Sequence, residues 1–223
     1  MKLAVLYSGG KDSNYSLYIA AKYHEISVLL NIIPENNESY LYHYINNNLT
    51  ELQARALNIP IERFYINNNE EEEKTLFESL KYLKEKYNIE GVVTGAIRST
   101  YQGARFQRIC KRLNLWCFNP LWLKDEKEYL YELLKNNFQF IIVGWYAYPL
   151  DINILGKVVD ENIIKKLIEY KEKYKINISG EGGEYETFVL YQPLFKKRII
   201  IKDYEIKVEK NYAEYIIKNA YLE

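Results

Sequence analysis

The chain has 223 residues, which is enough for one large domain or two smaller ones with a proper hydrophobic core. Its 30 lysine and arginine residues balance its 30 aspartate and glutamate residues. Because proteins that grip long RNA or DNA usually carry a basic excess, this balance disfavours stable nucleic-acid binding as the main function.

The two cysteines, Cys110 and Cys117, match neither a CxxC redox pair nor the ligand spacing of a zinc site. Two thiols without a disulfide framework indicate a reducing compartment, and we interpret both as small apolar core residues. The N-terminus lacks the form of a signal peptide, and no apolar run has the length of a membrane span. We therefore expect a cytoplasmic protein with no membrane partner.

Apolar runs of strand length alternate with helical patterns over residues 1–120. The runs cover 3–7, 26–33, 61–66, 91–95 and 115–118, and the helical patterns cover 13–23, 47–57, 76–87 and 105–113. This alternation predicts an α/β domain in which a parallel, Rossmann-like sheet carries helices on both faces. Ligands of such sheets bind beyond the carboxyl ends of the strands, where the strand order reverses.

The pattern changes after residue 120. Helices are expected at 125–135 and 160–174, with a strand at 140–143 between them. A glycine-rich loop and several β-rich runs follow, ending at 219–222. We therefore expect two domains, an α/β domain over 1–120 and a smaller α+β domain over 121–223.

The first expected strand runs into the loop SGGKDS, Ser8 to Ser13. The loop fails the spacing of a Walker loop, since Val5 and Asp12 stand where glycine and serine or threonine are needed, and it is no dinucleotide fingerprint either. Its glycines, hydroxyls and Lys11 still suit a phosphate at a helix N-terminus, and Asp12 suits Mg²⁺ among phosphates. The alternative is a tight turn with an ordinary N-cap.

A second segment, SGEGGEYET, covers Ser179 to Thr187 and combines three glutamates with three glycines. Carboxylates there could hold a metal, accept a proton from an amine or face a cationic substrate. The alternative is a solvated hairpin loop.

These segments carry a family resemblance. SGGKDS resembles the SGGxDS signature of the PP-loop ATP pyrophosphatases, and GEGGEYET with PLFKKRI resembles the diphthine–ammonia ligase family. Segments 39–43, 94–105 and 120–122 are also similar to that family, so the resemblance covers essentially the whole chain. Gln107 departs from it, since an acidic residue is more usual there, and we interpret Gln107 as helix surface.

The resemblance implies an adenine-nucleotide-alpha-hydrolase-like fold and the last step of diphthamide synthesis. ATP would activate the carboxylate of diphthine, a modified histidine on translation elongation factor two, as an acyl-adenylate. Ammonia would then displace AMP, after pyrophosphate has left. Domain 1–120 would bind ATP and domain 121–223 the substrate. The expected partners are the diphthine-bearing factor and ammonia, and a homodimer is one option for the oligomeric state.

The resemblance also implies site residues. The expected catalytic residues are Lys11, Asp12, Glu184 and Glu186, and Asp12 would hold Mg²⁺. The expected ATP-binding residues are Ser8, Gly9, Gly10, Lys11, Asp12, Ser13, Asn31, His43, Gly95, Ser99 and Arg105. The expected substrate-binding residues are Tyr101, Gln102, Glu181, Gly182, Gly183, Glu184, Tyr185 and Thr187. Because diphthine carries a trimethylammonium group, Tyr185, Trp145 and Tyr146 are further candidates for an aromatic wall.

Several of these residues could instead have an ordinary structural or surface role. Arg105 could be a solvated helix arginine, His43 a structural histidine, and His24 is expected at the surface. A PP-loop enzyme that modifies tRNA is one rival function, although neither cysteine looks like a persulfide carrier. A non-catalytic ATP-binding protein on the same scaffold is another.

Overall fold

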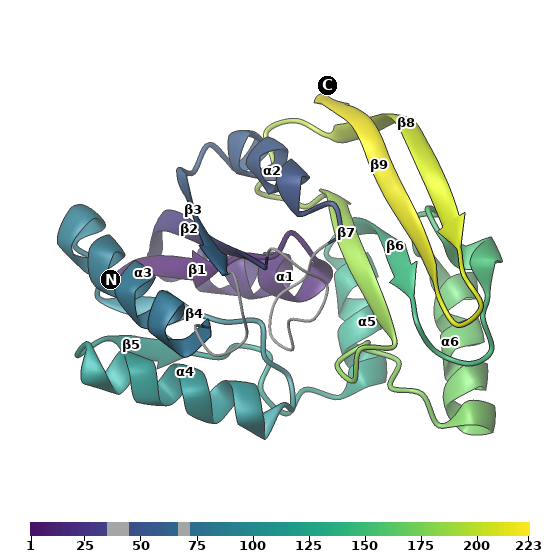
Figure 1. Cartoon of the computed structure of the whole chain (residues 1–223), viewed down its shortest axis with the longest axis horizontal. Helices are drawn as coiled ribbons and strands as arrows, with labels where there is room; N and C mark the ends of the chain where they lie inside the picture. The colour runs from purple at the N-terminus through teal and green to yellow at the C-terminus, as the bar shows by residue number, and fades with distance from the viewer. Residues whose placement is uncertain (35–44, 67–71) are drawn as a thin grey trace. The chain divides into compact units, whose positions relative to one another are not determined.

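The computed structural model describes residues 1–34, 45–66 and 72–223. The chain divides into two compact units, 1–123 and 124–223, each with its own sheet and helices (Figure 1). Each unit is described by itself.

The N-terminal unit alternates strands and helices along its length. Its elements are β1 (Lys2–Leu6), α1 (Lys11–Ala20), β2 (Glu25–Pro34), the 3₁₀ turn η1 (Asn47–Leu49), α2 (Thr50–Leu57), β3 (Ile61–Ile66), α3 (Glu72–Tyr87), β4 (Gly91–Val93), α4 (Thr100–Arg112) and β5 (Trp116–Phe118).

The five strands form one parallel sheet in the order β3-β2-β1-β4-β5. The chain first builds outward from β1 to β3 and then returns to the other side of β1 with β4 and β5. The order therefore reverses between β1 and β4, and the crevice beyond their carboxyl ends is where such sheets bind ligands. The expected Rossmann-like parallel sheet is confirmed.

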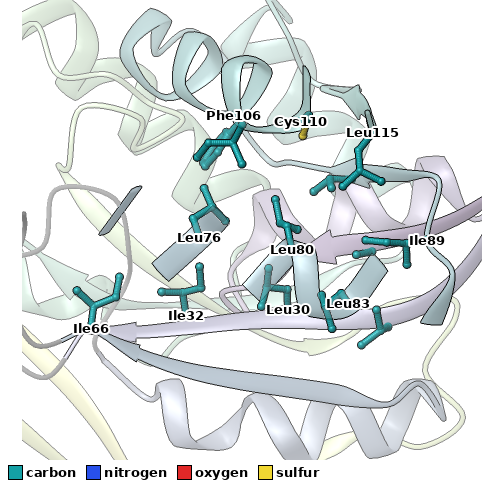
Figure 2. Close-up of a cluster of buried hydrophobic side chains, with 14 residues drawn as sticks. Leu30, Ile32, Ile66, Leu76, Leu80, Leu83, Ile89, Phe106, Cys110 and Leu115 are labelled. Carbon is teal, nitrogen blue, oxygen red and sulfur yellow. The ribbon is translucent and has the colours of Figure 1, made fainter. Parts of the chain in front are cut away.

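Helices cover both faces of this sheet because alternate strand residues point to opposite sides. On one face, Ala4, Leu30 and Val92 pack against leucines of α3 and against Phe106 and Ile109 of α4 (Figure 2). On the other face, α1 contacts β1, β2 and β4 and buries Leu17.

Helix α4 begins at Thr100, five residues before the expected start at 105. Ser99 is its N-cap, and the Ser99 side chain accepts a hydrogen bond from the backbone N–H of Gln102 at 3.3 Å. Gly103 lies within this early part of the helix, and because glycine disfavours helices, the sequence predicted a later start. Its absent side chain is what lets Trp122 approach, since a Cβ there would lie 3.1 Å from the indole.

The C-terminal unit packs two helices with an antiparallel sheet in the order β7-β6-β9-β8. Its elements are α5 (Glu126–Lys135), β6 (Gln139–Trp145), the 3₁₀ turn η3 (Ile152–Ile154), α6 (Glu161–Tyr174), β7 (Tyr185–Tyr191), β8 (Ile199–Val208) and β9 (Ala213–Leu222). Tyr129, Phe140 and Trp145 are among the largest fully buried side chains of its core. The expected α+β architecture is confirmed.

Three side chains outside the site bear on the earlier expectations. Cys110 is buried in the core cluster (Figure 2). Cys117 is partly buried and packs against the same cluster, which confirms both as core residues. The expectation for His24 was wrong: its ring is half-buried, with its centroid 5.4 Å from that of Phe118. Among the described helices, none is both long and apolar enough to span a membrane.

Candidate functional site

The loop Ser8–Gly10 lies at the carboxyl end of β1, next to the reversal of strand order. Gly9 has φ of +83°, a backbone conformation that glycine adopts readily and that residues with a Cβ disfavour. Helix α1 starts directly after Gly10, two residues earlier than expected, so its first turn contains Lys11, Asp12 and Ser13. The first N–H groups of a helix have no partner within the helix and carry partial positive charge, so the loop and helix together suit an anion.

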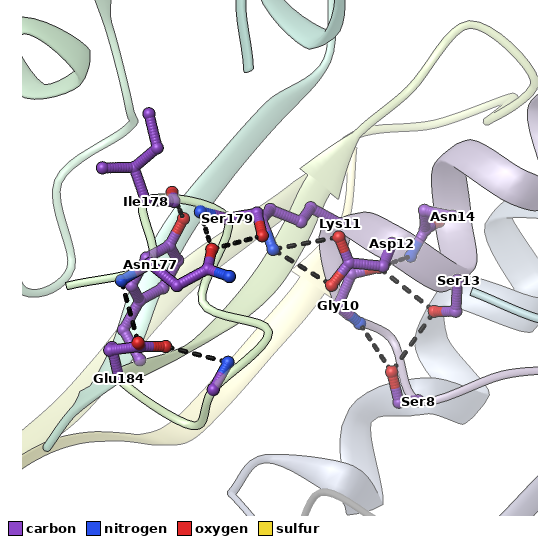
Figure 3. A network of polar contacts seen from close by, with 12 residues as sticks. Ser8, Gly10, Lys11, Asp12, Ser13, Asn14, Asn177, Ile178, Ser179 and Glu184 are labelled. Atoms are coloured by element: carbon purple, nitrogen blue, oxygen red, sulfur yellow. Dashed lines mark hydrogen bonds and ion pairs between the residues drawn. The ribbon is translucent and has the colours of Figure 1, made fainter. Parts of the chain in front are cut away.

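Polar groups converge at this helix start (Figure 3). The Ser8 and Ser13 hydroxyl oxygens lie 3.3 Å apart, and the Gly10 N–H points toward the Ser8 hydroxyl at 3.4 Å. The Lys11 ammonium contacts both carboxylate oxygens of Asp12 at 3.0 Å. A phosphate could accept hydrogen bonds from the hydroxyls, the N–H group and the lysine. The Asp12 carboxylate balances the charge of Lys11.

Buried amide side chains hold the loop from the protein side. Asn31 of β2 donates to the carbonyl of Tyr7 at 2.8 Å, and Asn14 of α1 donates to the carbonyl of Gly10 at 3.0 Å. Gln53 of α2 donates to the carbonyl of Gly9 at 2.9 Å. The Asn31 side chain contacts the loop backbone and Thr50, and its expected role toward the nucleotide stays a prediction.

Sequence reasoning missed Asn14 and Gln53. Both are polar residues at positions that the helix patterns turn toward the protein interior, and both are fully buried. An amide among the apolar residues of the 47–57 pattern was the available signal, because a buried amide needs a partner.

The loop after β4 comes close to the phosphate loop. A Cβ on Gly95 would lie 3.1 Å from the backbone of Asp12 and Ser13, so a larger residue would push against that backbone. The sheet topology thus brings Gly95 beside the residues of the first signature, as the expected site requires. Ser99 sits further along this loop as the cap of α4.

Arg105 has protein partners in the structure. Its guanidinium lies 3.3 Å from Glu73 and 3.5 Å from Glu72, and it donates to the Tyr101 hydroxyl at 2.7 Å. A phosphate would therefore compete with two carboxylates for this group. Its role toward ATP stays a prediction, as do the substrate roles of Gln102, which is half-buried, and Tyr101, which is 62% exposed.

The second signature forms a loop that internal hydrogen bonds hold together with the residues just before it (Figure 3). One Glu184 oxygen accepts from the backbone N–H of Asn177 at 2.8 Å, and the other accepts from that of Gly182 at 2.9 Å. The Asn177 side chain in turn accepts from the Ser179 N–H and hydroxyl. Glu184 thus holds its own loop closed, a structural task that a free catalytic carboxylate would not have.

Tyr185 is a core residue, and its expected place in a substrate wall stays a prediction. It is 3% exposed, its ring stacks on Trp145 at 5.9 Å, and its hydroxyl donates to the carbonyl of Ile178 at 2.5 Å. Tyr185 is paired directly with Trp145 of β6, and directly paired residues share a face of the sheet, so the strand register brings the two rings together.

Two carboxylates of the C-terminal sheet lie on either side of a glycine. Glu186 of β7 and Glu214 of β9 both pair with Gly144 of β6, and directly paired residues share a face of the sheet. The Tyr146 ring occupies the space over Gly144, with its hydroxyl 3.5 Å from Glu214. Burial raises the pKa of Glu214, and burial together with the Glu186 charge raises the pKa of the Tyr146 hydroxyl.

The remaining expected residues have simpler positions. Glu181 is half-buried and Gly182 and Gly183 are exposed in the loop, while Thr187 is half-buried in β7. His43, with the similar segment 39–43, lies outside the described residues. Gln107 is exposed on α4, as expected.

A glycine-rich anion-binding loop at the switch point of a parallel sheet defines the class of this chain: a phosphate-binding α/β protein. Comparison with protein families narrows the class. The family model described as diphthamide synthase N-terminal domain matches residues 1–116, and the one described as diphthamide synthase C-terminal domain matches residues 125–222. The chain therefore belongs to the diphthamide synthase family.

Diphthine–ammonia ligases from two mammals agree with this assignment. A diphthine–ammonia ligase from Homo sapiens is 38% identical over a match that covers 100% of this chain and 90% of that protein. The one from Bos taurus is also 38% identical, with 92% and 85% covered. Among solved structures, a predicted subunit of tRNA methyltransferase from Methanocaldococcus jannaschii is 17% identical with a TM-score of 0.41, covering 86% of this chain and 98% of that one.

Proposed function

We propose that this chain is a diphthine–ammonia ligase, which uses ATP to convert diphthine on translation elongation factor two into diphthamide. The observation that carries the proposal is the match of both units to diphthamide synthase domains, with the SGGKDS loop at the switch point of the sheet. The reaction joins carbon to nitrogen: the diphthine carboxylate attacks the α-phosphorus of ATP, pyrophosphate leaves, and ammonia displaces AMP from the acyl-adenylate.

In this proposal the N-terminal unit binds ATP and separates pyrophosphate from AMP. The hydroxyls of Ser8 and Ser13 and the N–H of Gly10 face one another, so they can share the oxygens of one anion. Lys11 adds the positive charge that stabilises pyrophosphate as it departs. These donors are fixed by the fold before the ligand arrives, which is what electrostatic stabilisation requires.

Asp12 is the residue that would hold Mg²⁺. Among the described residues, no three His, Cys, Asp or Glu side chains gather in a way that could hold a metal by themselves. One carboxylate beside a phosphate loop does fit Mg²⁺, because this ion takes few protein ligands and completes its shell with phosphate oxygens and water. When bound, Mg²⁺ would offset the negative charge of the phosphates beside Asp12.

The C-terminal unit would bind the diphthine side chain. Glu186 is a better candidate than Glu184 for taking the proton of ammonia, because both oxygens of Glu184 already accept backbone N–H groups. Glu186, Glu214 and the Tyr146 ring together offer negative charge and an aromatic face, which suit the trimethylammonium group. We place the reaction in the cytoplasm, where elongation factor two works.

The test combines the purified chain with ATP, Mg²⁺, ammonium and elongation factor two that carries diphthine. Mass spectrometry should find the factor lighter by the difference between a hydroxyl and an amino group, and chromatography should find AMP and pyrophosphate. Asp12→Asn should lower the rate of AMP formation by about 100-fold, since it removes the charge that holds Mg²⁺. Asp203→Asn, an exposed change on β8, is the charge-matched control and should leave the rate unchanged.

An unmodified factor without AMP, or turnover that yields ADP, would contradict the proposal. Equal losses in Asp12→Asn and Asp203→Asn would contradict the role of Asp12.

A further inference from the structure

Gln53 contacts the phosphate loop from a separate element of the N-terminal unit. It lies on α2, is fully buried, and donates its side-chain N–H to the carbonyl of Gly9 at 2.9 Å across 44 positions of sequence. The hydrogen bond involves a main-chain carbonyl, so Gln53 acts on the loop and not on a ligand directly.

The contact sets the direction of one peptide unit. In a trans peptide the C=O and the following N–H point in opposite directions. When Gln53 holds the Gly9 carbonyl toward α2, the N–H of Gly10 must face the other way. The structure agrees, because that N–H points to the Ser8 hydroxyl, which in turn lies beside the Ser13 hydroxyl.

Gly9 and Gln53 also fit each other sterically. A Cβ on Gly9 would lie 2.6 Å from the Gln53 side-chain oxygen, which is closer than atoms can pack. The positive φ of Gly9 brings its carbonyl to the amide, and the missing Cβ makes room for it.

Helix α2 itself is tied to the same loop, so Gln53 is held in place. The Thr50 hydroxyl contacts the Asn47 carbonyl at 2.7 Å and the Asn31 side-chain oxygen at 3.4 Å. Asn31 donates to the Tyr7 carbonyl, two residues before Gly9. A rigid support of this kind is what keeps a binding group in its productive geometry.

We propose that Gln53 is a positioning residue of the phosphate loop: its side-chain amide turns the Gly9–Gly10 peptide so that the Gly10 N–H faces the pyrophosphate portion of the nucleotide. The proposal rests on the proposed function, in which this loop binds the two outer phosphates of ATP. The proposal predicts that loss of the Gln53 amide weakens the binding of pyrophosphate but not of AMP. A buried amide that only satisfies a carbonyl would not have this selective effect.

The test measures dissociation constants by calorimetry, with pyrophosphate and AMP as separate probes in the presence of Mg²⁺. Gln53→Met keeps the length of the side chain but removes the donor, and it should weaken pyrophosphate binding by about 10-fold while AMP binding stays within about 2-fold. Gln192→Met is the matched control, since Gln192 is an equally buried glutamine of the C-terminal unit. It should leave both constants unchanged.

A second variant covers the case in which Gln53→Met fails to fold. Gln53→Glu keeps the shape, but its ionised carboxylate repels the Gly9 carbonyl, whereas its protonated form can donate to it. Burial raises the pKa of such a carboxyl, so the ratio of variant to wild-type pyrophosphate affinity should increase as the pH falls. Because an added negative charge alone would also repel the phosphate of AMP, the proposal predicts that the pH-dependent change is confined to pyrophosphate, and a similar change for AMP would contradict it.

The inference would be overturned if folded variants bound pyrophosphate and AMP with equally changed dissociation constants, or with no change in either. The proposed function would still stand in that case, provided the wild-type chain converted ATP to AMP. If the wild-type chain bound no pyrophosphate and formed no AMP, the proposed function would fail first and the inference with it.

Discussion

At the scale of single residues, two glycines with the same backbone conformation differ in the space around them. Gly9 and Gly183 have nearly the same positive φ, +83° and +84°. The space around them differs, because a Cβ on Gly9 would meet Gln53 and Thr50, whereas a Cβ on Gly183 would meet nothing within 4 Å. The two positions therefore separate backbone strain from steric exclusion.

This difference gives a residue-scale prediction. Gly183→Ala should lower the free energy of unfolding by about 1–2 kcal/mol, the strain of a left-handed backbone conformation. Gly9→Ala should lower it by a further amount of about 1–3 kcal/mol, because the methyl group displaces Gln53 from a packed site. Urea unfolding of each variant measures both values, and equal losses would show that the loop tolerates the methyl group.

At the scale of elements, helix ends show how local chemistry defines a boundary. Helix α6 begins after Asp160, whose carboxylate accepts the backbone N–H of Ile163 at 2.9 Å. Helix α5 begins in the same way after Asp125, which accepts from the backbone N–H groups of Lys127 and Glu128. Helix α1 differs, because its N-cap is Gly10, which has no side chain to accept such a hydrogen bond.

The Asp160 cap predicts a pH-dependent stability. The N–H of Ile163 lowers the pKa of the Asp160 carboxyl relative to the unfolded chain. Its contribution is therefore complete above the unfolded pKa and is lost as the pH falls through the folded pKa. Asp160→Ala should cost about 1 kcal/mol at neutral pH, and the difference from wild type should shrink in acid.

Asp160→Asn is the control for this cap, because asparagine keeps the accepting oxygen without a titrating group. It should be nearly as stable as wild type at neutral pH. Urea titrations at neutral and acidic pH compare the three chains, and a loss in Asp160→Ala that did not change with pH would contradict the assignment of the effect to the carboxylate.

At the scale of the whole molecule, each unit contains a hydrophobic core built from its own elements. Leu80 of α3 is buried in the core of the N-terminal unit, and Leu133 of α5 is buried in the C-terminal unit (Figure 2 shows the former). Removing either side chain creates a cavity that costs about 2–5 kcal/mol.

We expect each cavity to act mainly on its own unit. Leu80→Ala should reduce amide-exchange protection within residues 1–123, and Leu133→Ala should reduce it within residues 124–223. Exchange followed residue by residue tests this. If each variant lowered protection equally throughout the chain, the two units would unfold as one cooperative body.

Much of the architecture was predictable because it depends on local patterns. Alternating apolar runs and helical periods predicted the strands of the N-terminal unit, and SGGKDS predicted an anion site after the first of them. Boundaries were less accurate where two local preferences conflict. Gly103 disfavours a helix, yet the Ser99 cap and the approach of Trp122 make it part of α4.

The roles of individual side chains were harder to predict, because a role depends on partners that sequence spacing does not reveal. Glu184 and Tyr185 are neighbours in an acidic, aromatic segment that suggested substrate contacts. In the folded chain, Glu184 binds its own loop and Tyr185 stacks in the core. Their neighbour Glu186 points to the other face of β7 from Tyr185, and lies across Gly144 from Glu214.

The sequence by itself determined the order of strands and helices, the phosphate-type loop and the family resemblance, since each is written in residue types at short spacing. Only the tertiary structure decided that Gln53 reaches Gly9 and that Glu186 and Glu214 share one face of a sheet. The physical reason is that such contacts join residues far apart in the chain, and strand register and helix packing, not local propensity, determine which of them meet.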